Sequence, residues 1–167
     1  TAIDQGNFNV IKQHMEFGTD PNEIFIPFPF PFTGASALHL AVLKNREDLT
    51  ELLLENGADI NIKAKETFQG TPLDWAAFWG IKNMVVFLLE QGAEINSKTS
   101  VGSTPLDSAG ANNPFVKPQD VEEFKKNRAF IKEYLREKGG KSSTPTPTPT
   151  PTAILVLPTA SPQPSIS

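Results

Sequence analysis

The chain has 167 residues, with 15 lysines and arginines against 19 aspartates and glutamates, and no cysteine. Its net charge of −4 gives no electrostatic reason to expect nucleic acid or an anionic membrane as a partner. The lack of cysteine excludes disulfides, thiolate chemistry and Cys-based zinc sites. No apolar run approaches the roughly 20 residues that span a bilayer, so no membrane span is expected.

The composition changes sharply at Lys141. All charged side chains lie at or before this residue, whereas residues 142–167 carry none and contain no aromatic ring. This change predicts a folded body at residues 1–141, a Thr-Pro linker at 142–152 and an apolar and polar tail at 153–167.

Within the body, a helix–turn–helix pattern recurs. The stretch "LLLENGADIN" at 52–61 returns as "FLLEQGAEIN" at 87–96, an offset of 35. The stretch "GTPLDWAA" at 70–77 returns as "STPLDSAG" at 103–110, an offset of 33, and "SALHLAV" is an earlier, weaker copy at 36–42. Periods of this length indicate a repeat architecture in which neighbouring units bury each other's apolar faces.

Each copy has signals for two helices. Thr71 is a good N-cap and Pro72 suits the first helical position, so the first helix begins there. The second helix has apolar residues at helical spacing and ends at Gly57 or Gly92, both suited to a left-handed C′ position. An extended "ADIN" or "AEIN" then leads into the next unit.

These motifs resemble the ankyrin repeat. The family signature T-P-L-H-x-A is matched at 71–76 and 104–109, each with Asp in place of His, and more loosely at 36–41. The family turn G-A-D-x-N is matched at 57–61 and 92–96, with a degenerate copy at 18–22. The resemblance implies an all-α repeat solenoid. It would be a stack of helix–turn–helix units joined by β-hairpin loops, with an extended Thr/Pro-rich C-terminal tail.

The resemblance covers about residues 1–141 and divides them into units. Expected units are 1–22 (partial), 32–63, 66–98 and 99–141. The last unit is a C-terminal cap with a polar second helix, which shields the stack from water. An insertion at 111–127 is expected between the two helices of this cap.

The segment "NEIFIPFPFPFTG" at 22–34 is rich in phenylalanine and proline. Proline lacks an N–H and fixes φ, so this segment cannot be the interior of a helix or a central strand. The ankyrin register places it in the hairpin finger between the first and second units. Its rings either patch the core of the incomplete first unit, form a partner-binding surface or make a crystal or oligomer contact. The candidate residues are Phe25, Phe28, Phe30 and Phe32.

The resemblance also implies a concave groove. The helix positions just after the signature usually face this groove; they are Leu43, Lys44, Phe78 and Trp79. Adjacent residues on a helix point about 100° apart, so Phe78 and Trp79 cannot both lie on one buried stripe. An exposed aromatic ring would anchor an interface, whereas the alternative is that Trp79 packs on the neighbouring hairpin.

Two signature residues are predicted to be structural. Trp75 is expected in the core. The resemblance implies that His39 forms a hydrogen bond with the hairpin backbone.

The tail begins with "TPTPTPTPT" at 144–152, an alternation that favours a polyproline II rod of about 28 Å and is typical of O-glycosylated stalks. The segment "AILVLP" at 153–158 follows. It is expected to add to the sheet edge of a partner or a neighbouring copy, or to meet the Phe-Pro finger, unless the tail is simply disordered. The candidate docking residues are Ile154, Leu155, Val156 and Leu157.

No enzyme constellation is found. The only imidazoles are His14 and His39, and the glycines lack the G-x-G-x-x-G and P-loop spacings. We therefore expect no catalytic residues, no metal site and no cofactor.

The expected function is a protein–protein interaction module that binds another protein through the groove, the hairpin fingers and the Phe/Pro-rich loop 24–32. The alternative is an assembly subunit whose tail docks onto a neighbouring copy or a larger complex, with self-association through the tail. The Thr-Pro stalk, the start at Thr1 and the lack of cysteine favour an exported, periplasmic or extracellular location over a cytoplasmic one.

Overall fold

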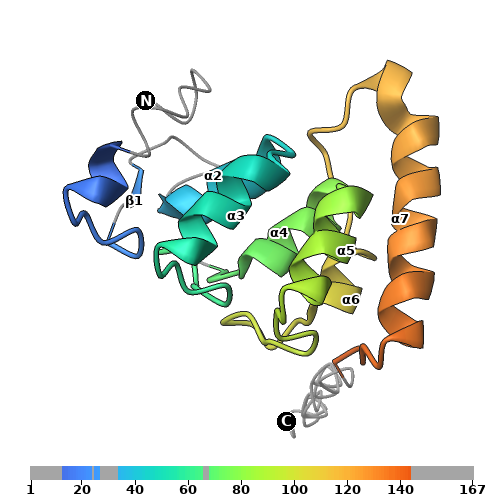
Figure 1. The fold of residues 1–167 in the computed structure, drawn as a ribbon. Coiled ribbons are helices and arrows are strands. Elements are labelled where there is room, and N and C mark those ends of the chain that lie inside the picture. The colour runs from blue at the N-terminus through green and yellow to red at the C-terminus, as the bar shows by residue number, and fades with distance from the viewer. Residues whose placement is uncertain (1–12, 24, 27–33, 66–67, 144–167) are drawn as a thin grey trace, which may run out of the picture.

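The computed structural model describes residues 13–23, 25–26, 34–65 and 68–143. Residues 13–16 are helical, and three helix pairs follow them (Figure 1). The pairs are α2 (Ala37–Leu43) with α3 (Glu47–Glu55), α4 (Pro72–Trp79) with α5 (Lys82–Glu90), and α6 (Pro105–Ser108) with α7 (Val121–Glu137). A single 3-10 turn, η1 (Pro118–Asp120), precedes α7.

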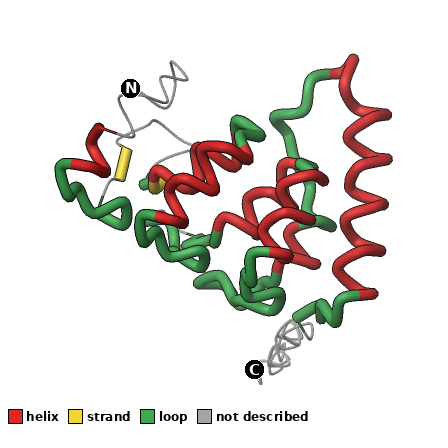
Figure 2. The backbone as a smooth tube through the Cα atoms, in the orientation of Figure 1, coloured by secondary structure: helices red, strands yellow, loops and turns green. Residues whose placement is uncertain are grey.

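The pairs stack into two layers. In the first layer α4 lies between α2 and α6, and in the second layer α7 packs on α5. The loops that join successive pairs gather at one end of the helices (Figure 2). This arrangement confirms the predicted repeat stack.

Capping boxes fix where the first-layer helices begin. At Ser36, Thr71 and Thr104 the hydroxyl accepts the N–H of the residue three positions on, and that residue's side chain accepts the cap's own N–H. The reciprocal partners are His39, Asp74 and Asp107. Two N–H groups are thereby satisfied at each helix start. The start of α4, with Thr71 as its N-cap and Pro72 as its first residue, agrees with the sequence prediction.

The core runs through the stack as two buried clusters. Leu38, Leu49 and Leu53 of the first helix pair pack with Trp75 of the second, which confirms that Trp75 is a core residue. The other cluster joins Leu73, Met84 and Leu88 to the cap residues Ile131 and Leu135. Each cluster draws residues from more than one pair, so the units depend on one another for burial.

The Phe-Pro segment belongs to a hairpin, as predicted. Strand β1 (Phe25–Ile26) pairs antiparallel with β2 (Ala35–Ser36), with Phe25 opposite Ser36 and Ile26 opposite Ala35. Residues 27–34 therefore connect the two strands. Phe28, Phe30 and Phe32 lie outside the described residues, and only the backbone of Phe25 is described, so their predicted roles stay predictions.

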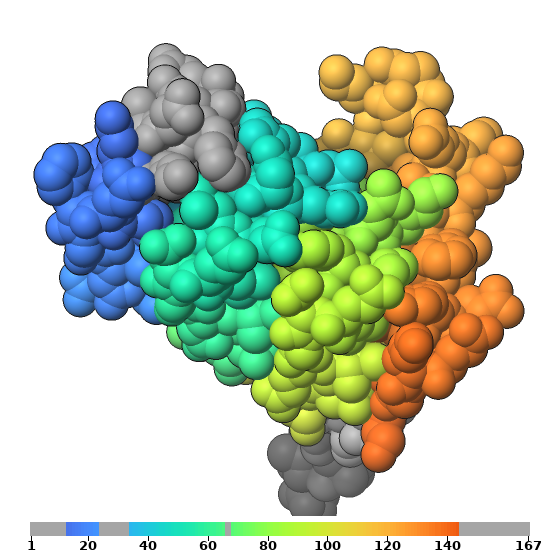
Figure 3. Space-filling view, viewed as in Figure 1, coloured from blue at the N-terminus to red at the C-terminus, as the bar shows by residue number. Residues whose placement is uncertain are grey.

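The cap differs from the prediction. Helix α7 begins at Val121, so the connection between the last two helices spans 109–120 and the predicted insertion 111–127 is wrong at its end. The early start has a packing cause, since the Phe124 ring lies against the turn at Gly80. With 17 residues against 9 in α5, the first turns of α7 rise beyond the stack (Figure 3).

Asparagines link the successive turns. Asn22 accepts the Asp59 N–H at 2.7 Å, Asn61 accepts the Glu94 N–H at 2.8 Å, and Asn96 accepts the Lys141 N–H at 2.7 Å. The last turn, "GGKSS" at 139–143, has serines where the earlier turns have the apolar residue and the asparagine. This substitution explains why the ladder ends there.

No helix in the described ranges has the length and apolar character needed to cross a bilayer.

Candidate partner-binding surface

Three aromatic rings meet at the C-terminal end of α4. Phe78 and Trp79 are both half-buried, and their ring centroids lie 5.6 Å apart in an edge-to-face contact. The ring of Trp79 lies 5.8 Å from that of Phe115, which is 43% exposed. We call Phe78, Trp79 and Phe115 the aromatic ledge.

Trp79 packs against the first core cluster and also contacts Phe115.

The connection 109–120 is fixed beside the ledge by two side chains. Asn113 is buried; its amide donates to the Phe78 carbonyl at 3.3 Å and accepts the Phe115 N–H at 3.0 Å. Arg128 of α7 donates to the backbone carbonyls of Ser108, Ala109 and Ala111, and its guanidinium lies 5.0 Å from the centre of the Phe124 ring. These bonds fix the backbone on both sides of Phe115, which remains 43% exposed.

The remaining predicted groove residues lie at the end of α2 that corresponds to the ledge. Leu43 is half-buried against the first core cluster, and Lys44 is exposed. Whether either residue touches a partner stays a prediction.

The sequence analysis missed two exposed apolar residues on the hairpin fingers. Phe68 is 54% exposed and Val101 is 63% exposed. Their fingers are joined by a bond from the Ser100 N–H to the Phe68 carbonyl at 2.8 Å, and the Lys65 N–H bonds the Gly34 carbonyl at 2.9 Å one finger earlier. The available signal was their spacing of 33 residues, the repeat period itself. We call Phe68 and Val101 the finger pair.

His39 has the structural role implied by the resemblance. Its Nε2–H donates to the Gly70 carbonyl of the next finger at 3.0 Å, and its Nδ1 accepts from the Ser36 hydroxyl at 2.8 Å. The ring also makes an edge contact with Trp75 at 4.7 Å. Burial lowers the pKa of His39 to about 4, so the imidazole is neutral near pH 7.

The two aspartates at the signature position are also used within the stack. Burial raises the pKa of Asp74, which accepts a hydrogen bond from the Ser108 hydroxyl at 3.3 Å. Burial alone would raise the pKa of Asp107 too, but hydrogen bonds from Ser143 and Thr104 outweigh it and lower that pKa. Among the residues that the structure describes, no three His, Asp or Glu side chains are grouped to hold a metal ion.

Several known proteins are similar to part of this chain. Ankyrin repeat and SOCS box protein 6 of Mus musculus is 35% identical over 99 residues, which are 59% of this chain and 23% of that protein. Ankyrin repeat and SAM domain-containing protein 6 of Rattus norvegicus is 33% identical over 106 residues, 64% of this chain and 11% of that protein. Protein phosphatase 1 regulatory subunit 12A of Mus musculus is 41% identical over 77 residues, 46% of this chain and 7% of that protein. The chain thus spans less than a quarter of the length of each of these three relatives.

The family comparison agrees with the geometry of the stack. A family model described as ankyrin repeats in three copies matches residues 1–99, more than half of the chain. With its capping boxes, paired helices and hairpin connections, the chain belongs to the ankyrin repeat family.

Proposed function

We propose that this protein is a non-catalytic interaction module that binds another protein through its finger pair and aromatic ledge. Ankyrin repeats are in general protein–protein interaction modules, which supports the class of function. The observation that carries the proposal is the ledge. Phe115 keeps 43% of its surface exposed although Asn113 and Arg128 fix the backbone around it. Large rings held rigidly at a surface are typical interface anchors, since little entropy is lost when they bind.

The fingers extend the proposed surface. Phe68 and Val101 project from adjacent connections whose backbones are bonded to each other, so they form a pair of neighbouring apolar points. The Phe/Pro-rich loop 24–32, expected to contact a partner, lies mostly outside the described residues. Its predicted contact residues remain part of the proposal.

We assign no catalytic role to the chain. The polar side chains of the signature positions, the buried His39 and Asp74 and the half-buried Asp107, take part in capping boxes and in further hydrogen bonds within the stack. The described ranges leave no buried side-chain nitrogen or oxygen without a hydrogen-bond partner. These groups therefore serve the stack.

The test is an affinity capture from native extract with variants of the full chain. Phe115→Ser alters the ledge, and the double change Phe68→Ser with Val101→Ser alters the finger pair. Phe17→Ser is the matched control, because Phe17 is 87% exposed and lies outside the proposed surface. Loss of one anchor is expected to weaken the captured partner's binding by about tenfold or more.

A partner retained equally by all these variants would contradict the proposal. Circular dichroism of each variant checks that the stack is intact. Since the altered side chains are exposed, helicity should be unchanged.

A further inference from the structure

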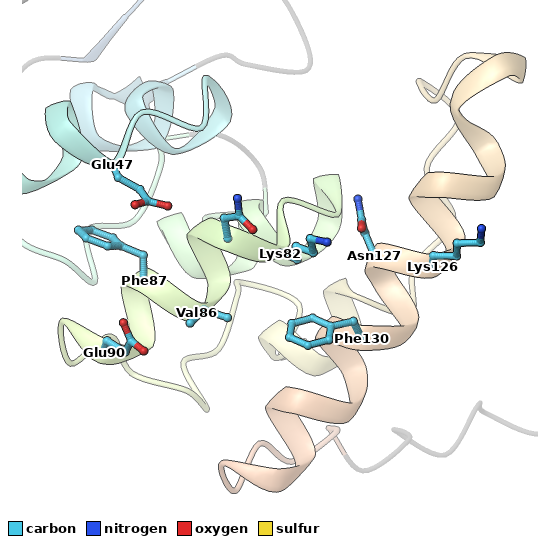
Figure 4. A pocket seen from close by; sticks show the side chains of 9 residues that line it. Glu47, Lys82, Val86, Phe87, Glu90, Lys126, Asn127 and Phe130 are labelled. Carbon is cyan, nitrogen blue, oxygen red and sulfur yellow. The ribbon is translucent and has the colours of Figure 1, made fainter.

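A recessed surface lies on the second layer of helices, away from the ledge. A hollow of about 460 Å³ is formed mainly by α5 and α7, and no ledge residue lines it. Phe130 is 46% exposed and extends from α7 toward Val86 of α5 (Figure 4). The apolar lining is Val86, Phe87 and Phe130, and the polar lining is Glu47, Lys82, Asn83, Glu90, Lys126 and Asn127.

The chemistry of this α5–α7 hollow favours an uncharged occupant. Two glutamates and two lysines line it, so their formal charges cancel. The amides of Asn83 and Asn127 can both donate and accept hydrogen bonds, which suits the backbone of a peptide. The three apolar side chains offer contact to aliphatic groups. A short apolar peptide without charges therefore matches the lining.

We propose that the α5–α7 hollow docks the chain's own segment Ala153–Pro158. This segment lies outside the described residues. Residues 142–167 have no charged side chain, and Ile154 to Leu157 form an unbroken apolar run. Burial of such a run is favourable, and the hollow offers apolar contacts within a lining that has no net charge.

The tail begins close enough to reach the hollow. The Ser143 N–H donates to Asp107 at 2.8 Å, and the Thr104 hydroxyl donates to the Lys141 carbonyl at 2.7 Å, so the origin of the tail is held against the start of α6. Phe130 lies seven residues before the end of α7, about 10 Å along the helix. The nine residues 144–152 can span about 28 Å when extended.

Tethering makes a small contact sufficient. Because the segment is joined covalently to the stack, docking is an intramolecular step, so weak intrinsic affinity is enough for occupancy. Docking on the second layer would cover the apolar run while leaving the finger pair and the ledge accessible. The inference thus goes beyond the proposed function and does not depend on it.

Thiol labelling of the full chain tests the proposal, because the natural sequence has no cysteine. Asn127→Cys places one thiol in the hollow. Ala129→Cys is the matched control, because Ala129 is exposed on the same helix and does not line the hollow. Each cysteine variant is made with three tails: the natural tail, a tail with both Leu155→Asp and Val156→Asp, and a tail with Thr146→Asp. The last change adds a charge outside the apolar run.

With the natural tail or Thr146→Asp, the thiol in the hollow is expected to react at least about fivefold more slowly than with the doubly charged tail. The control thiol should react at one rate in all three backgrounds. The slow reaction should persist in monomeric protein between about 1 and 50 µM, since docking within one chain does not depend on concentration.

Equal rates for the Asn127→Cys thiol with all three tails would overturn the proposal. So would slow labelling only at the higher concentration together with a dimeric mass, because the occupant would then be a second copy.

Discussion

His39, Asp74 and Asp107 occupy the same position in three successive units, yet each meets a different group further along the chain. All three accept the N–H of their helix N-cap. His39 also faces the Gly70 carbonyl, which requires a donor, whereas Asp74 and Asp107 face donors, the Ser108 hydroxyl and the Ser143 N–H. A carboxylate would repel the Gly70 carbonyl, which explains why this unit uses histidine.

The buried imidazole of His39 predicts a pH-dependent stability. Its pKa falls from 6.5 to about 4 on folding, so the unfolded state takes up the proton first as the pH drops. The free energy of unfolding therefore falls by up to about 3 kcal/mol as the pH drops from 6.5 to 4. Above pH 6.5 this contribution is fully present and does not increase further. Urea unfolding at a series of pH values measures this loss.

Two variants isolate the contribution of His39. His39→Gln keeps a side chain that can complete the capping box and donate to Gly70, but it does not titrate. It should lose less stability than the natural protein between pH 7 and pH 4. His14→Gln removes the other histidine, which is exposed, and is the matched control. Parallel curves for His39→Gln and the natural protein would refute the assignment.

At the scale of elements, some helix boundaries depend on local residues and others depend on contacts with distant parts of the chain. Helices α2 to α5 could be predicted because their signals are local: N-cap residues for α2 and α4, and apolar spacing with a terminal glycine for α3 and α5. The start of α7 could not, since it depends on Phe124 packing against Gly80, 44 positions earlier in the chain. The same holds for the connection 109–120, which Arg128 fixes from α7.

The contact between Gly80 and α7 predicts the effect of adding one methyl group. Gly80 has a φ of +71°, and a Cβ there would lie 2.8 Å from the Phe124 ring. Gly80→Ala should cost roughly 2–3 kcal/mol, from backbone strain and displacement of α7. Gly57→Ala is the matched control: its φ is +90° but a Cβ would meet nothing within 4 Å, so about 1 kcal/mol is expected.

Urea unfolding of both variants, and of each combined with Phe124→Ala, separates the two causes. Removing the ring should reduce the cost of Gly80→Ala and leave that of Gly57→Ala unchanged. Equal costs for the two alanines would show that Phe124 does not restrict Gly80.

At the scale of the whole molecule, periodicity made the stack predictable while the candidate surface was found only in part. The repeat register identified the positions of Phe78 and Trp79 without showing that Phe115 would join them. That contact depends on the path of the connection 109–120, which is longer than the connections between α2 and α3 and between α4 and α5. Phe68 and Val101 could have been noticed from their repeat spacing, but their exposure follows from the conformation of the fingers.

The whole stack also sets which face is offered to a partner. The finger pair and the ledge lie on the connections and the first layer, whereas the α5–α7 hollow lies on the second layer. If these surfaces have separate occupants, a bound partner should leave α3 and α5 as accessible as in the free protein.

Hydrogen exchange of the full chain with and without its captured partner tests the central claim most directly. The account predicts slower amide exchange at the fingers around Phe68 and Val101 and at the connection that carries Phe115. Exchange in the second-layer helices α3 and α5 should be unchanged. Slower exchange confined to α3 and α5, with the fingers and Phe115 unaffected, would contradict it.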